Sequence, residues 1–131
     1  MALKDIEAAF KEAHETLPGL KAISAVEVES GLAHGSLIVD KDFDLDAASA
    51  YNSEVLKAKL RAKDAMGMKK ENVDIIIIEL TSQIHLIQPT PNGKYLVYMA
   101  ADRSNTNIGI ARKVVLEVGK KIQSALDLSR V

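Results

Sequence analysis

The fold of this chain depends on residues 73–80, which read Val-Asp-Ile-Ile-Ile-Ile-Glu-Leu. Side chains of a strand alternate between the two faces of a sheet, so four consecutive isoleucines put apolar groups on both faces. Such a strand needs cover above and below. If the strand lies at a sheet edge, its backbone also needs a partner along that edge. The position of residues 73–80 therefore decides whether the chain is self-contained or half of an assembly.

The composition predicts one globular domain over residues 1–131. Of the 131 residues, 47% are hydrophobic and 27% are charged, which is ordinary for a globular protein. A net charge of −1 provides no strong field that would attract nucleic acid. An aromatic content of 4% leaves few rings on which bases could stack. We therefore expect no nucleic-acid partner.

The sequence also bears on location. The chain has no cysteine, so a reducing compartment is allowed and disulfide and thiolate chemistry are excluded. Residues 1–7 mix charged and apolar residues and lack the apolar run of a signal peptide. No stretch approaches the roughly 20 apolar residues that cross a bilayer. We expect a cytoplasmic protein without membrane insertion.

Periodic patterns on either side of residues 73–80 predict the remaining elements. Helical spacing predicts helices over residues 3–16, 46–66 and 105–126. Alternation predicts strands over residues 20–28, 73–80, 83–88 and 94–100, and a further strand with residues 36–39 at its centre. The order is therefore αββαβββα, with short hairpins and no βαβ crossover, so we expect an antiparallel sheet of the α+β class. The predicted apolar stripe of the middle helix consists of Ala48, Tyr51, Val55, Ala58, Ala62 and Met66.

No pattern in the sequence predicts catalysis, a cofactor or a metal. The histidines His14, His34 and His85 fall on a helix, a loop and a strand, and none has metal-ligand spacing to another histidine or carboxylate. Residues 31–36 are glycine-rich but lack the Gly-Lys-Ser/Thr ending of a P-loop. No hydroxyl residue has a base at recognisable spacing. We expect a protein that is not an enzyme.

Alternating aspartates in residues 40–46 are also typical of calcium loops. An EF-hand loop needs glycine at its sixth position and glutamate at its twelfth, and no register here supplies both. We interpret this segment as a solvated turn in which Asp44 or Asp46 caps the following helix.

Basic residues concentrate in and after the second half of the middle helix. They are Lys57, Lys59, Arg61, Lys63, Lys69 and Lys70. Such a concentration is most often a solvated helix face. The alternative is a docking surface for an acidic partner.

Three local features accompany the order αββαβββα. A Leu17-Pro18-Gly19-Leu20 helix stop precedes the first strand, a hairpin pair spans residues 73–88, and residues 106–112 read Thr-Asn-Ile-Gly-Ile-Ala-Arg. Together they resemble the roadblock / dynein light chain family, whose last helix often starts with a similar Asn-Leu-Gly-Leu-x-Arg pattern. The resemblance covers nearly the whole chain. One departure concerns the subfamily, because many members have an Asp-Gly turn where this chain reads Glu-Ser-Gly-Leu-Ala-His-Gly over residues 29–35.

This resemblance implies a roadblock or profilin-like sandwich with a five-stranded antiparallel sheet. The first and last helices would cover one face and the middle helix the other. In the family, the third strand lies at an edge and pairs with its copy in a second subunit, and the two middle helices pack together. Carried over to this chain, the dimer interface would contain Tyr51, Val55, Ile75, Ile76, Ile77 and Ile78. The residues left for another partner would be Lys57, Arg61 and Lys63.

The resemblance also implies a function. Family members are non-enzymatic subunits of dynein, or scaffolds and regulators of small Ras-like GTPases. We therefore expect a homodimeric interaction module that regulates or scaffolds such a GTPase. The alternative is a small-ligand sensor of profilin-like or PAS-like architecture. That alternative would require a cavity reached by polar side chains such as His85 or Tyr98.

Overall fold

The computed structural model describes residues 2–128. The elements follow the predicted order αββαβββα, with a short 3₁₀ helix before the last α-helix. They are α1 (Ala2–Thr16), β1 (Leu20–Glu27), β2 (Ala33–Ile38), α2 (Leu45–Ala65), β3 (Ile76–Glu79), β4 (Gln83–Pro89), β5 (Tyr95–Asp102), η1 (Arg103–Asn105) and α3 (Ile108–Leu128).

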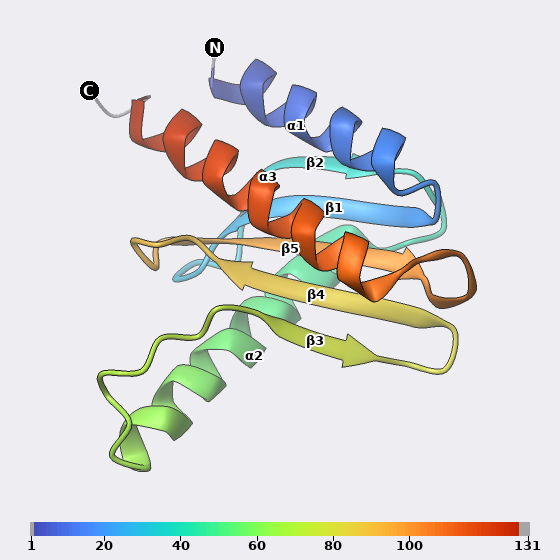
Figure 1. The fold of residues 1–131 in the computed structure, drawn as a ribbon. Helices are drawn as coiled ribbons and strands as arrows, with labels where there is room; N and C mark the ends of the chain where they lie inside the picture. The colour runs from blue at the N-terminus through green and yellow to red at the C-terminus, as the bar shows by residue number, and fades with distance from the viewer. Residues whose placement is uncertain (1, 129–131) are drawn as a thin grey trace.

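The strands form one antiparallel sheet in the order β2-β1-β5-β4-β3 (Figure 1). The expectation of a five-stranded antiparallel sheet is therefore confirmed, and β3 lies at an edge as the resemblance implied. The other edge strand, β2, is irregular. Ala25 pairs with Gly35 but Val26 pairs with Ala33, so His34 is an extra residue that forms a bulge.

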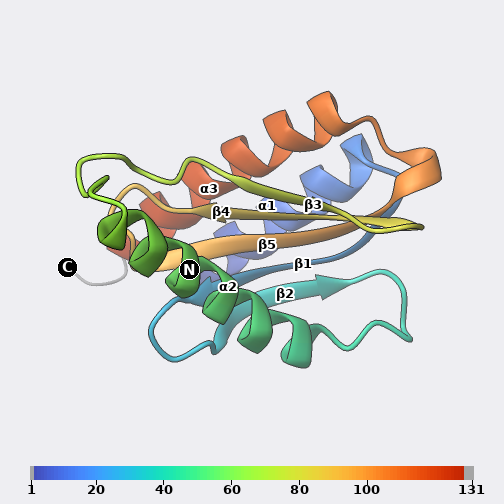
Figure 2. The same ribbon diagram turned by 90° about the horizontal axis from the view of Figure 1, so that it is seen from below.

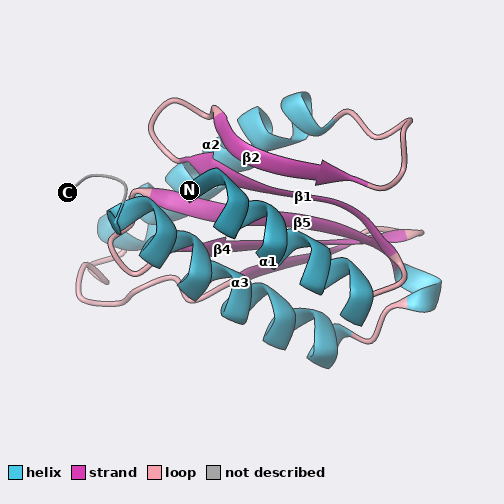
Figure 3. Cartoon of the chain, turned by 90° about the horizontal axis from the view of Figure 1, so that it is seen from above, coloured by secondary structure: helices cyan, strands magenta, loops and turns pink. Residues whose placement is uncertain are grey.

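Helices cover both faces of the sheet. α1 and α3 lie side by side on one face, and α2 crosses the other face (Figures 2 and 3). Beneath α1 and α3, residues such as Phe10, Leu86 and Met99 form one buried cluster. Beneath α2, Leu56 packs with Tyr98 and other sheet residues in a second cluster. Two covered faces explain why the central strand β5 is apolar almost throughout.

The predicted apolar stripe of the middle helix does not mark the side that faces the sheet. The buried residues of α2 are Leu45, Ser49, Ser53 and Leu56. The hydroxyl of Ser49 lies 3.0 Å from that of Ser24 on β1, so each hydroxyl has a partner inside the core. Because the side of α2 that contains Ser49 and Ser53 faces the sheet, most of the apolar stripe, including Tyr51 and Met66, is turned to solvent.

Strand β3 is shorter than the predicted strand over residues 73–80, and Pro89 gives the reason. The backbone N–H of Thr90 donates a hydrogen bond to the carbonyl of Tyr95 on β5. Because backbone groups alternate in direction along a strand, those of the preceding residue, Pro89, point toward β3. Proline has no N–H to offer there. The ladder between β3 and β4 accordingly ends at the pair Ile76–Ile87. Pro89, expected outside the strands, is instead the last residue of β4.

Both later helices begin at side-chain caps. The Asp44 carboxylate accepts a hydrogen bond from the backbone N–H of Ala47 at 3.1 Å, which confirms the predicted cap of α2. The Asn107 side chain accepts one from the N–H of Ile110 at 3.0 Å. The last helix therefore starts slightly later than predicted, after the turn of η1.

Candidate functional site

The outer edge of β3 carries backbone groups that no strand of this chain pairs with. Leu80 donates its N–H to the carbonyl of Gln83 at 2.8 Å, so Leu80 faces β4. Backbone groups alternate in direction along a strand, so Ile76 and Ile78 also face β4. Ile77 and Glu79 therefore turn their N–H and C=O groups away from the sheet. Within the described residues, β4 is the only strand beside β3.

The isoleucine side chains divide between the two faces as the sequence predicted. Ile75 and Ile77 pack against the cluster beneath α1 and α3. Ile76 packs against the cluster beneath α2. All of residues 75–78 remain partly exposed, because no element lies beyond the edge to cover them. The edge is therefore both unpaired and apolar.

A groove of about 550 Å³ joins this edge to the exposed side of α2. We call it the α2–β3 groove; its apolar lining comprises Val55, Met66, Met68, Val73, Ile75 and Ile76. The exposed fractions of Met66 and Met68 are 63% and 40%, which is high for such large apolar side chains. The groove thus brings together three of the predicted interface residues. Tyr51, which is 74% exposed, lies one helical turn before Val55.

The three basic residues predicted to bind a partner lie in different environments. Lys57 donates to the carbonyl of Glu29 at 2.8 Å and forms an ion pair with Glu54. Lys63 pairs with Asp64, and its side chain is only 13% exposed. Arg61 is exposed, and no hydrogen bond or ion pair holds it within residues 2–128. Of the three, Arg61 is the one whose charge is available at the surface.

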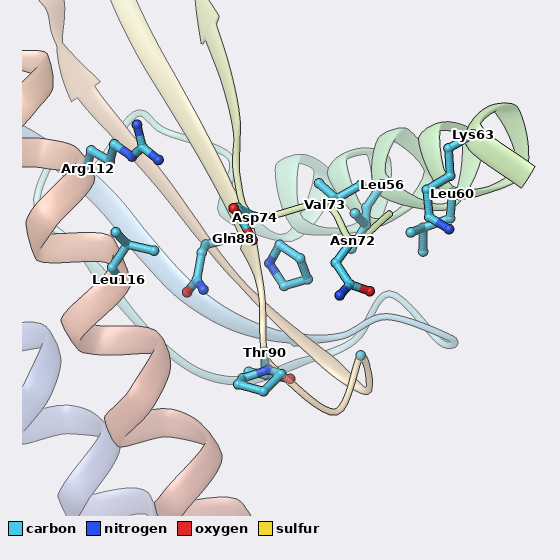
Figure 4. Close-up of a pocket in the computed structure, with 13 residues that line it drawn as sticks. Leu56, Leu60, Lys63, Asn72, Val73, Asp74, Gln88, Thr90, Arg112 and Leu116 are labelled. Carbon is cyan, nitrogen blue, oxygen red and sulfur yellow. The ribbon is translucent and has the colours of Figure 1, made fainter. Parts of the chain in front are cut away.

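A second hollow lies where β3 leaves the sheet. This notch has a volume of about 520 Å³ and lies between residues 72–74 and the end of β4. Figure 4 shows Leu56, Leu60 and Lys63 of α2 on one side of it and Arg112 and Leu116 of α3 on the other. Sequence reasoning missed this notch. The one signal for it was Pro89, which ends the ladder beside it.

Gln88 lies in the wall of the notch, beneath α3. Its amide oxygen is buried and has no hydrogen-bond partner among the described residues. A Cβ added to Gly119 would lie 1.9 Å from that oxygen. Glycine at position 119 therefore permits the close approach of α3 to the end of β4.

His85 and Tyr98 do not line the notch. Their side chains contact each other in the core. The Tyr98 hydroxyl lies 3.2 Å from His85 Nδ1, and His85 Nε2 lies 2.8 Å from Gln83 Oε1. The amide oxygen can only accept, so Nε2 donates and Nδ1 accepts from Tyr98. The Phe43 ring stacks on Tyr98 with a centroid separation of 6.4 Å. Burial lowers the pKa of His85 and raises the pKa of Tyr98.

The acidic turn and the remaining histidines also have local contacts. Asp40 accepts hydrogen bonds from the N–H of Asp42 and from Lys21, and these contacts lower the pKa of its carboxyl group. The His34 ring meets Tyr95 edge-on at 5.7 Å. In residues 2–128, no group of three or more histidine or acidic side chains is arranged to hold a metal ion. No helix in the same range is long and apolar enough to cross a membrane.

Comparison with known proteins places the fold. No family model and no curated protein sequence matches this chain. The structure of MglB from Myxococcus xanthus matches with a TM-score of 0.82 at 11% identity, covering 95% of this chain and 90% of that one. A roadblock/LC7 domain from Streptomyces avermitilis matches with a TM-score of 0.76 at 16% identity, covering 88% and 92%. A structure described as MglB with tetrameric arrangement matches with a TM-score of 0.75 at 11% identity, covering 92% and 89%. The fold of this chain is the roadblock/LC7 fold, as the resemblance implied.

Proposed function

We propose that this chain is a homodimeric interaction module that regulates or scaffolds a small Ras-like GTPase. The observation that supports a homodimer is the unpaired edge of β3, which adjoins the apolar α2–β3 groove. An apolar, unpaired edge in a lone chain is a hazard for aggregation. A second copy that pairs along this edge and covers the groove removes the hazard.

Similar proteins support self-association. One structure of the same fold is described as having a tetrameric arrangement, so this architecture associates with itself in at least one relative. In the family that this chain resembles, the third strand and the middle helix form the dimer contact. Here these elements carry Ile75, Ile76 and Val55, which line one groove. We therefore assign the dimer interface to β3 and the exposed side of α2, including Tyr51, Ile77 and Ile78.

The GTPase half of the proposal rests on the fold and on the basic side of α2. The two MglB structures share this fold, and the resemblance implies regulation of a small GTPase. Arg61 is exposed on α2, and Lys57 lies one helical turn before it, whereas Lys63, only two residues further on, points to the other side of the helix. Arg61 presents positive charge to an acidic partner surface, whereas Lys57 and Lys63 are already paired with Glu54 and Asp64. The module would act by positioning the GTPase's own residues, with no catalytic group from this chain.

Two measurements test the proposal. Light scattering during size-exclusion chromatography should give twice the 14.2 kDa chain mass at micromolar concentration, and a monomer would contradict the dimer. Immobilised protein should recover a P-loop GTPase from native lysate, and the purified pair should bind with a preference between GTP-analogue and GDP states. Arg61→Glu should weaken this recovery, whereas Lys11→Glu on α1 is a matched charge reversal that should not. Equal recovery by both variants would contradict the assignment of Arg61.

The notch supports a second candidate, the small-ligand sensor. Its volume of about 520 Å³ falls in the range of ligand pockets, and Arg112 and Asp74 at its rim offer opposite charges to a ligand. A ligand that binds only the folded chain must raise its melting temperature. A metabolite screen should therefore find a compound whose stabilising effect is lost in Arg112→Ala. A screen without any such compound would remove this candidate.

A further inference from the structure

We infer that, in the homodimer proposed above, β3 pairs with β3 of a second copy in the one antiparallel register that places Ile77 opposite Ile77. This inference depends on the proposed dimer but goes beyond it, because it fixes which residues meet. It follows from the direction of the backbone groups, the length of the strand and the position of Glu79.

Symmetry and backbone direction restrict the choice of register. In a twofold dimer, the same edge is used by both copies, so equal strands run antiparallel about an axis. Residues that lie opposite each other must both turn their backbone groups into the interface or both turn them away. Ile77 and Glu79 turn outward, whereas Ile76 and Ile78 turn toward β4. The axis must therefore pass through a residue and not between two residues.

The register centred on Ile77 uses the edge most fully. Ile77 exchanges hydrogen bonds with its own copy, and Glu79 exchanges them with Ile75, the residue that extends β3 at its start. On the α2 side, Ile76 of each copy lies opposite Ile78 of the other. Apolar side chains thus meet apolar side chains at the centre, and each Glu79 lies at the end of the ladder, where its carboxylate, 3.8 Å from Arg103, stays in solvent.

A register centred on Ile76 is less favourable. It places Ile78 opposite Asp74 of the second copy, a residue that lies outside β3. It also places Glu79 opposite Val73, which lies outside β3 in the segment that has already left the sheet. The outward backbone groups of Glu79 would then have no strand to pair with.

A register centred on Ile78 brings like charges together. Glu79 of each copy would lie opposite Ile77 of the other, so the two glutamates become diagonal neighbours across the axis. Diagonal neighbours lie within roughly 7–8 Å, and like charges at such short range oppose pairing. With the axis at Ile77, four residue positions separate the two glutamates along the strand direction. The charges of this strand therefore favour the Ile77-centred register.

The cysteine-free chain allows a direct test by disulfide cross-linking. Residues in a non-hydrogen-bonded antiparallel pair have Cα atoms about 4.5 Å apart, which a disulfide can span. Co-expression of Ile76→Cys and Ile78→Cys chains that carry different tags should give a mixed cross-linked dimer on oxidation. Neither variant alone should cross-link, because its cysteines would be diagonal and roughly 7–8 Å apart. Light scattering of the reduced samples reports whether the dimer itself has formed.

Ile77→Cys provides a second, independent readout. In the inferred register this residue faces its own copy at a Cα distance of about 5.5 Å, within disulfide range, so the single variant should cross-link with itself. In the other two registers, it would be diagonal to its own copy and should stay reduced. This variant also keeps the test decisive if one of the other substitutions prevents folding.

Each alternative result has its own meaning. Self-linking of Ile76→Cys or of Ile78→Cys overturns the register and leaves the dimer standing. A dimer by light scattering in which no variant cross-links overturns pairing along β3 altogether. A monomer in light scattering overturns both the register and the dimer of the proposed function.

Discussion

Ile78 on the edge strand lies directly opposite His85 on β4, and the imidazole of His85 accepts a hydrogen bond from buried Tyr98 on β5. A line of direct contacts therefore runs from the sheet edge to its centre. His85 is the titratable member of this line. Its charge state bears on both the core and the strand that we assign to the interface.

Acidification should destabilise the protein through His85. Burial lowers the pKa of His85 below its ordinary value of 6.5, so between the folded and unfolded pKa values the unfolded chain binds the additional proton. Stability therefore rises with pH in this window and falls as pH drops below about 6.5. Protonation of Nδ1 would also remove the acceptor that Tyr98 uses. Denaturant unfolding between pH 7.5 and 5.5 should show this loss.

A histidine substitution isolates the effect. His85→Gln should lower stability at pH 7.5 but flatten its dependence on pH down to 5.5. The same change at His14, a partly exposed residue of α1, is the matched control and should change the dependence less than His85→Gln does. A slope that is unchanged in His85→Gln would contradict the assignment.

Proline substitution should separate the two edges of β3. The N–H of Ile77 points outward, so Ile77→Pro removes a donor from the proposed dimer contact and none from the pairing with β4. We expect a folded monomer in light scattering, or insoluble protein if the edge stays uncovered. Ile76→Pro removes a donor to β4 and should lower the stability of the chain itself. Ile77→Lys should behave like Ile77→Pro, and a soluble dimer from either Ile77 variant would place the interface elsewhere.

The exposed side of α2 should contribute to dimer affinity without contributing to the fold. Val55 is 38% exposed and lines the α2–β3 groove. Val55→Glu should change the stability of the monomer by less than about 0.5 kcal/mol, as for most surface substitutions. The dimer dissociation constant should rise at least tenfold, which corresponds to about 1.4 kcal/mol. Leu32→Glu, at an exposed apolar residue in the β1–β2 turn, should leave that constant unchanged in sedimentation.

Gly119 and Gln88 should behave as a coupled pair. In Gly119→Ala, the new Cβ meets the Gln88 amide, the far end of a flexible side chain that must shift toward the notch. Better helix propensity returns up to about 1 kcal/mol. We expect Gly119→Ala to stabilise the unsubstituted chain less in urea unfolding than it stabilises a chain without the Gln88 amide. In a Gln88→Ala background the clash is absent, so Gly119→Ala should be stabilising there; equal effects in both backgrounds would refute the coupling.

Some features of this fold could be read from the sequence because they follow from local patterns. Four isoleucines predicted a strand covered on both faces, and the element order with the resemblance predicted its place at an edge. The orientation of α2 could not be predicted, because Ser49 is buried by virtue of a partner, Ser24, in a distant strand. The notch could not be predicted either. Its walls come from α2, α3 and the end of β4, which meet only in the folded chain.

The bulge at His34 bears on how far assembly can extend. Pairing of β3 with its own copy is complete after two chains. Pairing of β2 with β3 of the next chain would instead repeat head to tail and grow into a fibre. The extra residue bends β2, and a bent edge is a poor template for a straight neighbour. The bulge on the far edge therefore disfavours head-to-tail growth, whereas the proposed pairing of β3 with its copy closes on itself.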